Sequence, residues 1–267
     1  MSDFVKESGH WYDEHGKPAY TQITASGKNK GEERPTTIRD AKKLSLLPSV
    51  TTVTSILDKP ALTHWKIGRA IDILKGDIYS WMKKNQMPSG IPASFKLMFK
   101  VVQPDMENKA ERGSEIHAAL EQYLHNEEYD KECQPYIDIL NSVLEELGIA
   151  QDAEMHPERS FASKLGYGGA VDLPIYVGDG VIIDFKTKDM DTEKCKKLKA
   201  YDEHIMQLGA YRMGLELPKA KVYNLFLSRD NPTVYKLIEW TEEETQYGEQ
   251  MFMSVFNTWK LMKRYMP

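Results

Sequence analysis

The sequence contains little cysteine and no long apolar run. Its 267 residues include two cysteines, Cys133 and Cys195, which are too few for a disulfide framework and suit a reducing compartment. No apolar stretch approaches the ~20 residues of a membrane-spanning helix, and the N-terminal stretch lacks the features of a signal peptide. We therefore expect a cytoplasmic protein without a membrane partner.

An excess of positive charge is also missing. The formal net charge at pH 7 is −5, which argues against a broad surface that coats nucleic acid non-specifically. The basic residues gather in two local groups instead, namely Lys83, Lys84, Lys96 and Lys100, and Lys194, Lys196, Lys197 and Lys199. A solvated helix face is the ordinary explanation of such groups. It is the commoner outcome, although the acidic total does not argue against a narrow nucleic-acid channel.

The most informative stretch is Gly166–Lys188, GYGGAVDLPIYVGDGVIIDFKTK. It predicts two strands joined by a tight turn at Gly178–Gly180, because glycine accepts the positive φ that short hairpin loops need. If the loop has three residues, Val177 pairs with Val181. A one-residue shift from this register would turn every side chain of the strand to the other face.

This register places three polar side chains on one face. Asp172 lies opposite Lys186, and Asp184 is its diagonal neighbour. Two close carboxylates repel each other, and a hard divalent cation such as Mg²⁺ bound between them would relieve the repulsion. Lys186 adds a positive charge beside the metal, where a phosphate could bind. The alternative is a surface hairpin with a solvated Asp–Lys pair, and this stretch alone does not decide between the two.

Four short motifs follow one another over roughly residues 105–215. Their residues are Gly113, His117 and Glu121; Gly169 and Asp172; Asp184 and Lys186; Gln207 and Tyr211. This series resembles the G-x-x-x-H-x-x-x-E, G-x-x-D, D-x-K and Q-x-x-x-Y motifs of the RecB-like exonuclease branch of the PD-(D/E)XK nuclease superfamily. Val171 stands where the superfamily name would put a proline, which the G-x-x-D form of this branch does not require.

A second segment extends the resemblance towards the N-terminus. Pro48–Thr52, followed by a short predicted helix and Trp65, resembles the N-terminal part of phage-type and mitochondrial genome maintenance exonucleases in this branch. Ser49 would cap the short helix, and the hydroxyl groups of this segment could alternatively donate to a phosphate.

The resemblance implies a nuclease that uses Mg²⁺ or Mn²⁺ and assigns roles to particular residues. The implied metal ligands are His117, Asp172, Asp184, the backbone carbonyl of Phe185, and Glu158, which corresponds to a strand glutamate of relatives. The implied catalytic residues are Lys186, Asp184, Asp172, Gln207 and Tyr211. Lys186 would stabilise developing negative charge or deprotonate water. Some relatives hold an iron–sulfur cluster with four cysteines, which the two cysteines here exclude.

Several of these residues also have ordinary structural explanations. His117 and Glu121 could form an i,i+4 pair on a helix surface. Glu158 could be an exposed strand residue, and Gln207 and Tyr211 could belong to a half-buried helix. The order and spacing of the motifs favour the functional interpretation.

The expected fold is α/β, with a restriction-endonuclease-like central mixed β-sheet flanked by helices and an N-terminal, mostly helical lobe. The expected segments are a polar hairpin and loop at 1–46, a helical lobe over the DNA path at 47–106, the nuclease core at 107–240, and a C-terminal helix at 241–267. Periodicity predicts helices at 61–75, 78–84, 93–102, 108–125, 135–147 and 192–215, and strands at 155–162, 221–228 and 233–240.

The function expected from this reading is an exodeoxyribonuclease on single-stranded or end-opened DNA, acting in recombination, repair or replication. Phage or host recombination proteins are candidate partners besides DNA, and the resemblance favours a phage origin, with the cytoplasm of a bacterial host as the location. The alternatives are a structure-specific endonuclease or nickase, and a non-catalytic DNA-binding or assembly module. A sequence-specific restriction enzyme is less favoured, because no separate recognition domain is visible. The sequence sets no oligomeric state.

Overall fold

The computed structural model describes residues 9–58, 63–68 and 91–267, with side chains from 107 onwards in the last range. The chain divides into two compact units, one of Met1–Ile56 with Ile116–Pro267 and the other of Leu57–Glu115. In the second unit, the Lys109 ammonium lies 5.4 Å from the ring centroid of Trp65. Among the described residues, no helix is both long enough and apolar enough to cross a membrane.

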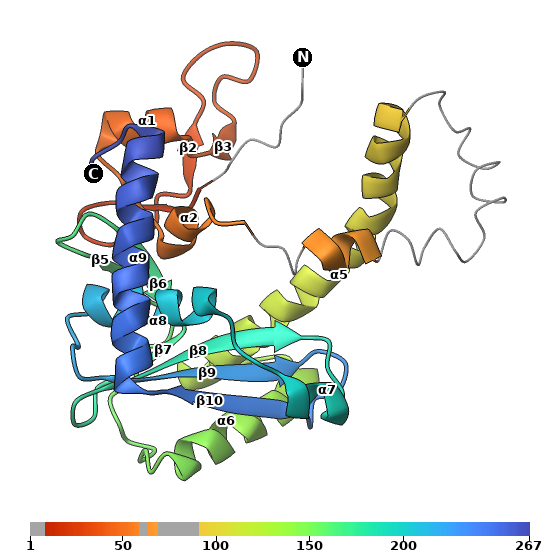
Figure 1. Ribbon diagram of the computed structural model, residues 1–267, viewed down its shortest axis with the longest axis vertical. Coiled ribbons are helices and arrows are strands. Elements are labelled where there is room, and N and C mark those ends of the chain that lie inside the picture. Colours follow the sequence, from red (N-terminus) through yellow and green to blue (C-terminus); the bar gives the residue numbers. More distant parts are fainter. Residues whose placement is uncertain (1–8, 59–62, 69–90) are drawn as a thin grey trace. The chain divides into compact units, whose positions relative to one another are not determined.

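A four-stranded mixed sheet forms the centre of the first unit, with strand order β10-β9-β8-β7 (Figure 1). Its strands are β7 (Leu173–Ile175), β8 (Val181–Lys188), β9 (Lys221–Ser228) and β10 (Tyr235–Trp240). β8 and β9 are parallel, and the two outer pairs are antiparallel. Near-continuous apolar runs are typical of strands buried on both faces. The expected mixed α/β organisation is confirmed, and β9 has the predicted bounds.

Helices cover both faces of this sheet (Figure 1). On one face, the end of α5 (Ile91–Leu124) and α6 (Gln134–Glu146) share an apolar core with β8 and β9 that includes Phe185. On the other face lies α8 (Asp202–Gly214), which packs in turn against α9 (Glu242–Lys263). Because side chains alternate along β8, Asp184 and Lys186 point to the α8 side.

The β7–β8 hairpin differs from the predicted register by two residues. Ile175 pairs with Val181, so residues 176–180 form the loop and the predicted three-residue loop is wrong. Gly178 and Gly180 do have the positive φ expected of the turn, at 56° and 96°. The additional loop residues lengthen the connection between the strands.

The observed register of β7 and β8 changes which polar residues lie opposite each other. In the observed register Asp172 lies level with Asp184 and not with Lys186. A shift of two residues preserves the alternation of side chains. Asp184 and Lys186 therefore share one face of β8, whereas Asp172 lies in the bend between β6 and β7 and its carboxylate binds the Phe185 amide at the edge of β8.

Two of the predicted helix boundaries are wrong. The helices expected at 93–102 and 108–125 form the single helix α5. The crossover helix expected at 192–215 is divided into α7 (Thr192–Lys197) and α8. The chain becomes extended at Leu198, and α8 begins anew where the Tyr201 amide donates to His204 Nδ1 at 2.9 Å.

Part of the predicted helical lobe lies outside the described residues. Of the helix expected at 61–75, residues 63–68 are described and are helical. The helix expected at 78–84 lies entirely outside them, as do Lys83 and Lys84 of the first basic group.

The N-terminal segment is built from short pairs of strands. They are β1 (Trp11–Tyr12) with β4 (Leu47–Pro48), and β2 (Thr21–Ile23) with β3 (Glu33–Pro35), accompanied by the helices α1 (Ile38–Leu44) and α2 (Val50–Thr54). The hairpin expected around residues 10–21 is reduced to a single bridge between Tyr12 and Pro18. Ser49 caps α2 as expected, because its side chain accepts from the Thr52 amide at 2.9 Å.

A separate two-stranded sheet joins β5 (Arg159–Ala162) to β6 (Gly168–Val171). The strand predicted at 155–162 is regular only over β5, because Glu158 has a φ of 49° and interrupts it. A short 3₁₀ helix, Lys131–Cys133, precedes α6. At the other end of the chain, Thr241 begins α9 with a capping box to Glu244.

Candidate metal and phosphodiester site

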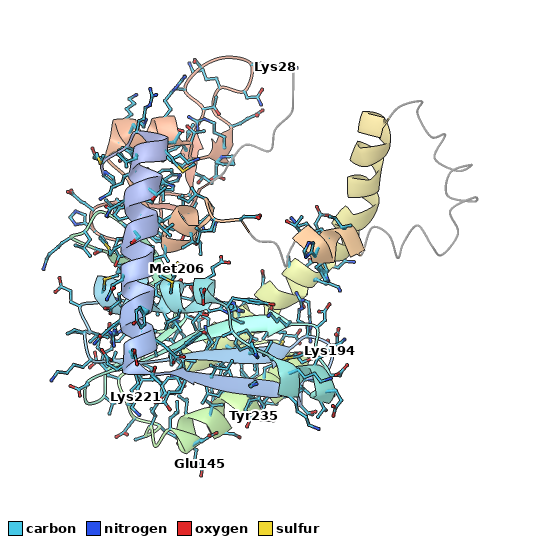
Figure 2. The ribbon with its side chains drawn as sticks, in the orientation of Figure 1. Lys28, Glu145, Lys194, Met206, Lys221 and Tyr235 are labelled. Atoms are coloured by element: carbon cyan, nitrogen blue, oxygen red, sulfur yellow. The ribbon has the colours of Figure 1, made fainter. Side chains whose placement is uncertain are left out.

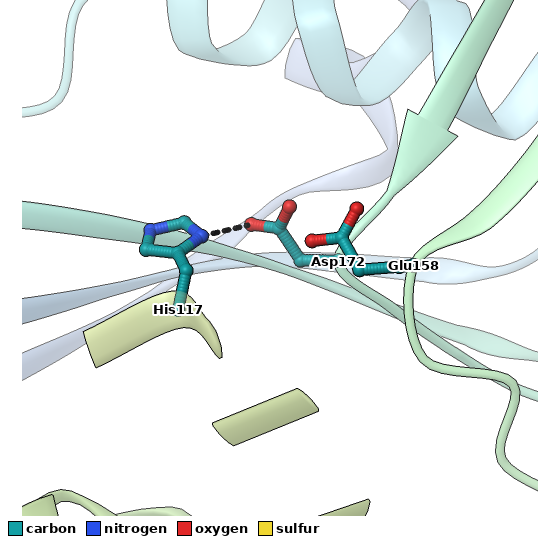
Figure 3. A group of neighbouring side chains, drawn as sticks. All are labelled: His117, Glu158 and Asp172. Atoms are coloured by element: carbon teal, nitrogen blue, oxygen red, sulfur yellow. Dashed lines mark ion pairs between the residues drawn. The ribbon is translucent and has the colours of Figure 1, made fainter. Parts of the chain in front are cut away.

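Three side chains from distant parts of the sequence meet at one edge of the central sheet. His117 comes from α5, Glu158 from the segment before β5, and Asp172 from the bend between β6 and β7 (Figure 3). One potential ligand atom of each lies within 4.8 Å of the other two. His117 Nδ1 is 3.9 Å from Asp172 Oδ2. We call this group the His–Glu–Asp cluster.

Backbone contacts fix the two carboxylates of the cluster. The Glu158 amide donates to the carbonyl of Asp172 at 3.0 Å, and the positive φ of Glu158 turns the chain at this point. Asp172 Oδ2 accepts from the Phe185 amide at 2.6 Å. The Asp172 carboxylate, just before the first residue of β7, therefore accepts from a β8 amide that lies beyond the paired part of β7.

The predicted backbone ligand is also on this side of β8. The amide and carbonyl groups of one residue in a strand point to the same edge. Because the Phe185 amide binds Asp172, the Phe185 carbonyl faces the edge on which the cluster lies. The Phe185 ring points to the apolar core and contacts the His117 ring edge-on, at 5.9 Å between centroids.

A buried ion pair lies beside the cluster on the α8 side of the sheet. Lys186 Nζ is 2.5 Å from Asp184 Oδ2, and the Asp184 side chain is 1% exposed. Asp184 Oδ2 also accepts from Asn224 Nδ2 at 2.8 Å. Asp184 Oδ1 is buried and has no hydrogen-bond partner among the described residues. A native buried oxygen without a partner calls for an explanation such as an ion or a water.

Asn224 is a site residue that the sequence analysis missed. It is fully buried on β9, in parallel register with Asp184. Its Oδ1 accepts from Trp240 Nε1 at 2.8 Å, and since an indole can only donate, this bond directs the Asn224 amide nitrogen at Asp184. An asparagine inside the apolar strand KVYNLFLS is the sequence signal that could have identified it.

The electrostatics of the site indicate an excess of negative charge. Burial, together with Asp172, Glu121 and Asp184, raises the pKa of Glu158 to about 7. Burial also raises the pKa of Asp184. For Lys186, burial lowers the pKa, but Asp184 and Asp172 outweigh this and leave it raised. One lysine thus balances only part of the charge that the carboxylates would carry.

The donor set fits a hard divalent cation. Carboxylate oxygens with one imidazole nitrogen suit Mg²⁺ or Mn²⁺. The buried Asp184 Oδ1 without a hydrogen-bond partner among the described residues and the closely spaced carboxylates around Glu158 are compatible with such a cation. The residues that would hold it are His117, Asp172, Asp184, the carbonyl of Phe185, and Glu158.

Gln207 and Tyr211 lie one turn apart on α8, as the motif spacing predicts. Gln207 Nε2 donates to the Tyr211 hydroxyl at 2.6 Å. Burial, with Asp184 and Asp172, raises the pKa of Tyr211 well above its usual range. A Cβ atom added at Gly169 would lie 2.8 Å from the Phe161 ring and 3.1 Å from the Tyr211 ring, so the glycine of the G-x-x-D motif makes space for both rings.

No family model and no curated protein matches the chain. The solved structures that are similar to parts of it include the following two. One is a crystal structure of SSO0001, 19% identical with a TM-score of 0.25; the match covers 44% of this chain and 58% of that one, so the chain spans little more than half of its length. The other is an alkaline exonuclease (LHK-Exo) from Laribacter hongkongensis, 16% identical with a TM-score of 0.34, covering 56% and 80%. At these TM-scores neither structure decides the fold or the activity.

Taken residue by residue, the structure brings the predicted set into one region. His117, Glu158 and Asp172 form the cluster, and Asp184 and Lys186 form the adjacent pair. Gln207 and Tyr211 bind each other on the helix above that pair. The chemistry of these groups, and not similarity to another protein, indicates the function.

Proposed function

We propose that the protein is a metal-dependent deoxyribonuclease, and specifically an exonuclease on single-stranded or end-opened DNA. The observation that supports this most is the position of the His–Glu–Asp cluster directly beside the buried Asp184–Lys186 pair. Hydrolysis of a phosphodiester needs a divalent cation and a positive group for the developing charge, and these two features could supply them.

The metal ion and the side chains around it would have different roles in hydrolysis. When bound, Mg²⁺ or Mn²⁺ supplies Lewis-acid polarisation of the phosphate. The raised pKa of Lys186 keeps its ammonium charged at neutral pH, which suits stabilisation of negative charge on the phosphate better than acceptance of a proton. Asn224 holds Asp184 in place.

Gln207 and Tyr211 act as positioning residues in this proposal. The Tyr211 hydroxyl is neutral at all ordinary pH values and accepts from Gln207. Their hydrogen bond stiffens the face of α8 that lies over the Asp184–Lys186 pair.

Cleavage of end-labelled linear single-stranded DNA tests the proposal, with Mg²⁺, Mn²⁺ or EDTA and with a circular single strand in parallel. We expect metal-dependent loss of the linear strand alone. Asp184→Asn should abolish it, whereas Asp179→Asn, which removes an exposed carboxylate in the β7–β8 loop, should not.

The other outcomes assign other functions. Cleavage of the circle would make the protein an endonuclease. Binding of DNA without cleavage under any metal condition would make it a non-catalytic DNA-binding or assembly module. Equal activity of the Asp184→Asn variant and the native protein would refute the assignment of the site.

A further inference from the structure

A second lysine lies on the same face of β8 as Lys186. Lys188 is two residues further along the strand, so its side chain points to the same side, roughly 7 Å away along the strand axis. Its ammonium group lies 4.8 Å from the ring centroid of Tyr201 and 5.3 Å from that of Phe226. Lys188 therefore contacts two aromatic rings on the face of β8 that carries Lys186.

No carboxylate among the described residues forms an ion pair with Lys188, in contrast to Lys186. Burial lowers the pKa of the Lys188 ammonium, and no neighbouring charge counters this effect. A half-buried cation without an anionic partner is an available partner for a phosphate. The spacing of roughly 7 Å between the two residues along the strand axis is similar to the separation of neighbouring phosphates along an extended nucleic-acid strand.

Tyr201 is well placed to contact a base. It is 53% exposed although its ring contacts both Lys188 and His204. It lies just before α8, where its backbone amide, and not its hydroxyl, makes the hydrogen bond to His204 Nδ1. The ring is therefore held at a fixed place without being needed for the helix cap.

We propose that Lys188 and Tyr201 form a nucleotide subsite next to the cleavage site, in which Lys188 binds the phosphate adjacent to the scissile one and Tyr201 stacks on an unpaired base. This inference rests on the proposed nuclease function and names the residues that would select a single strand. The subsite selects a single strand, because only an unstacked base offers its face to an aromatic side chain.

The charged residues around the subsite indicate the path that a bound strand would follow. Asp202 and Glu203 form the acidic first turn of α8 and would repel a phosphate from the helix terminus. The strand would leave the cleavage site towards the carboxyl end of β8, where α7 carries Lys194 (Figure 2). Two of the lysines of α7 form exposed ion pairs with carboxylates of the same helix end, Lys194 with Asp191 at 3.6 Å and Lys196 with Glu193 at 2.7 Å.

Binding in EDTA tests the subsite without cleavage. A fluorescent single-stranded oligodeoxynucleotide is titrated with the native protein and with Tyr201→Ala, Tyr201→Trp, Lys188→Met and Lys188→Arg. Tyr201→Ala should weaken binding roughly 5- to 150-fold, the range that loss of one base–aromatic stack gives, and Tyr201→Trp should restore it. Lys188→Met should reduce the slope of log affinity against log salt by about 0.7, the value for one phosphate contact on a single strand.

Two matched controls and a spectroscopic signal exclude a general effect on the fold. Tyr247→Ala removes a tyrosine of similar exposure, 56%, and Lys221→Met removes a lysine at the opposite end of the sheet (Figure 2). Neither should change binding. A 2-aminopurine base in the oligonucleotide should be quenched by the native protein and by Tyr201→Trp but not by Tyr201→Ala.

The results separate this inference from the proposed function. If the native protein cleaves DNA but Tyr201→Ala binds as tightly as Tyr247→Ala, the subsite is wrong and the nuclease assignment stands. An unchanged salt slope in Lys188→Met would overturn the phosphate contact in the same way. If the native protein neither binds nor cleaves a single strand, both the proposed function and the subsite are wrong.

Discussion

Replacing Lys186 by methionine removes one charge from the Asp184–Lys186 pair and preserves the apolar length of the side chain. The remaining carboxylate would be poorly compensated. Asp184 is 1% exposed, one of its oxygens accepts only from Asn224 besides Lys186, and the other has no partner among the described residues. The variant therefore leaves a buried negative charge without a cation.

The expected cost follows from the burial of the pair. Removing one partner of a buried ion pair destabilises a protein by about 3–5 kcal/mol. The Lys186 side chain is 25% exposed, and the hydrogen bond from Asn224 persists. We therefore expect a loss near the lower end, about 3 kcal/mol of the free energy of unfolding at pH 7.

The loss should depend on pH in a defined direction. Burial already raises the pKa of Asp184, and loss of the Lys186 charge raises it further. The unfolded chain ionises Asp184 near pH 4, so the penalty is absent below about pH 4 and grows as the pH rises above it. The stability difference between the native protein and the variant should shrink on acidification.

Urea unfolding followed by tryptophan fluorescence, in EDTA at pH 7.5 and pH 5, measures both effects. Lys188→Met is the matched control, because no carboxylate partners that lysine, and it should cost less than about 1 kcal/mol. The double variant Asp184→Asn with Lys186→Met should recover most of the loss. A Lys186→Met protein within about 0.5 kcal/mol of the native one at pH 7.5 would refute the argument.

Three further predictions concern the surroundings of this pair. Burial raises the pKa of Glu158 from 4.5 to about 7, so ionisation of this carboxyl group destabilises the folded protein as the pH rises through this range. Because Glu158 is partly exposed, Glu158→Gln should raise the free energy of unfolding in EDTA by only about 1–2 kcal/mol at pH 8 and should leave it unchanged at pH 4. The same variant should weaken metal binding measured by calorimetry. Gly248→Ala should cost roughly 1–2 kcal/mol in urea unfolding, because its Cβ would lie 2.5 Å from the Ile205 carbonyl oxygen, and a gain in stability would contradict the close crossing of α8 and α9. Tyr211→Phe should lower the free energy of unfolding by about 1 kcal/mol, because it removes the acceptor of the Gln207 amide. The variant should also cleave DNA more slowly while binding a single strand in EDTA with unchanged affinity. An unchanged cleavage rate would contradict the positioning role of Tyr211.

The parts of the fold that local patterns determine could be predicted from the sequence. Thr241 followed by Glu244 is a capping box, and α9 begins there. The apolar run at 221–228 forms β9 with the expected bounds. Asp184 and Lys186 could be predicted to share a face of β8, because residues two apart in a strand point to the same side.

The remainder depends on contacts between distant segments. The loop at 176–180 is longer than the glycines alone suggest, because Ile175 pairs with Val181. No glycine or proline marks the division between α7 and α8, and the hydrogen bond from Tyr201 to His204 that begins α8 has no distinctive sequence signal. The bond between Asn224 and Asp184 requires the parallel register of β8 and β9, which a single strand's sequence does not contain.

The bond from the Phe185 amide to Asp172 gives the site a spectroscopic reporter. A charge-assisted hydrogen bond of 2.6 Å shifts an amide proton strongly downfield in a nuclear magnetic resonance spectrum. That proton lies on the backbone, so it remains present in every side-chain variant of the site. Its chemical shift should move when a metal ion binds Asp172, and a single ¹⁵N-labelled position at Phe185 would report metal binding at the cluster without any substrate.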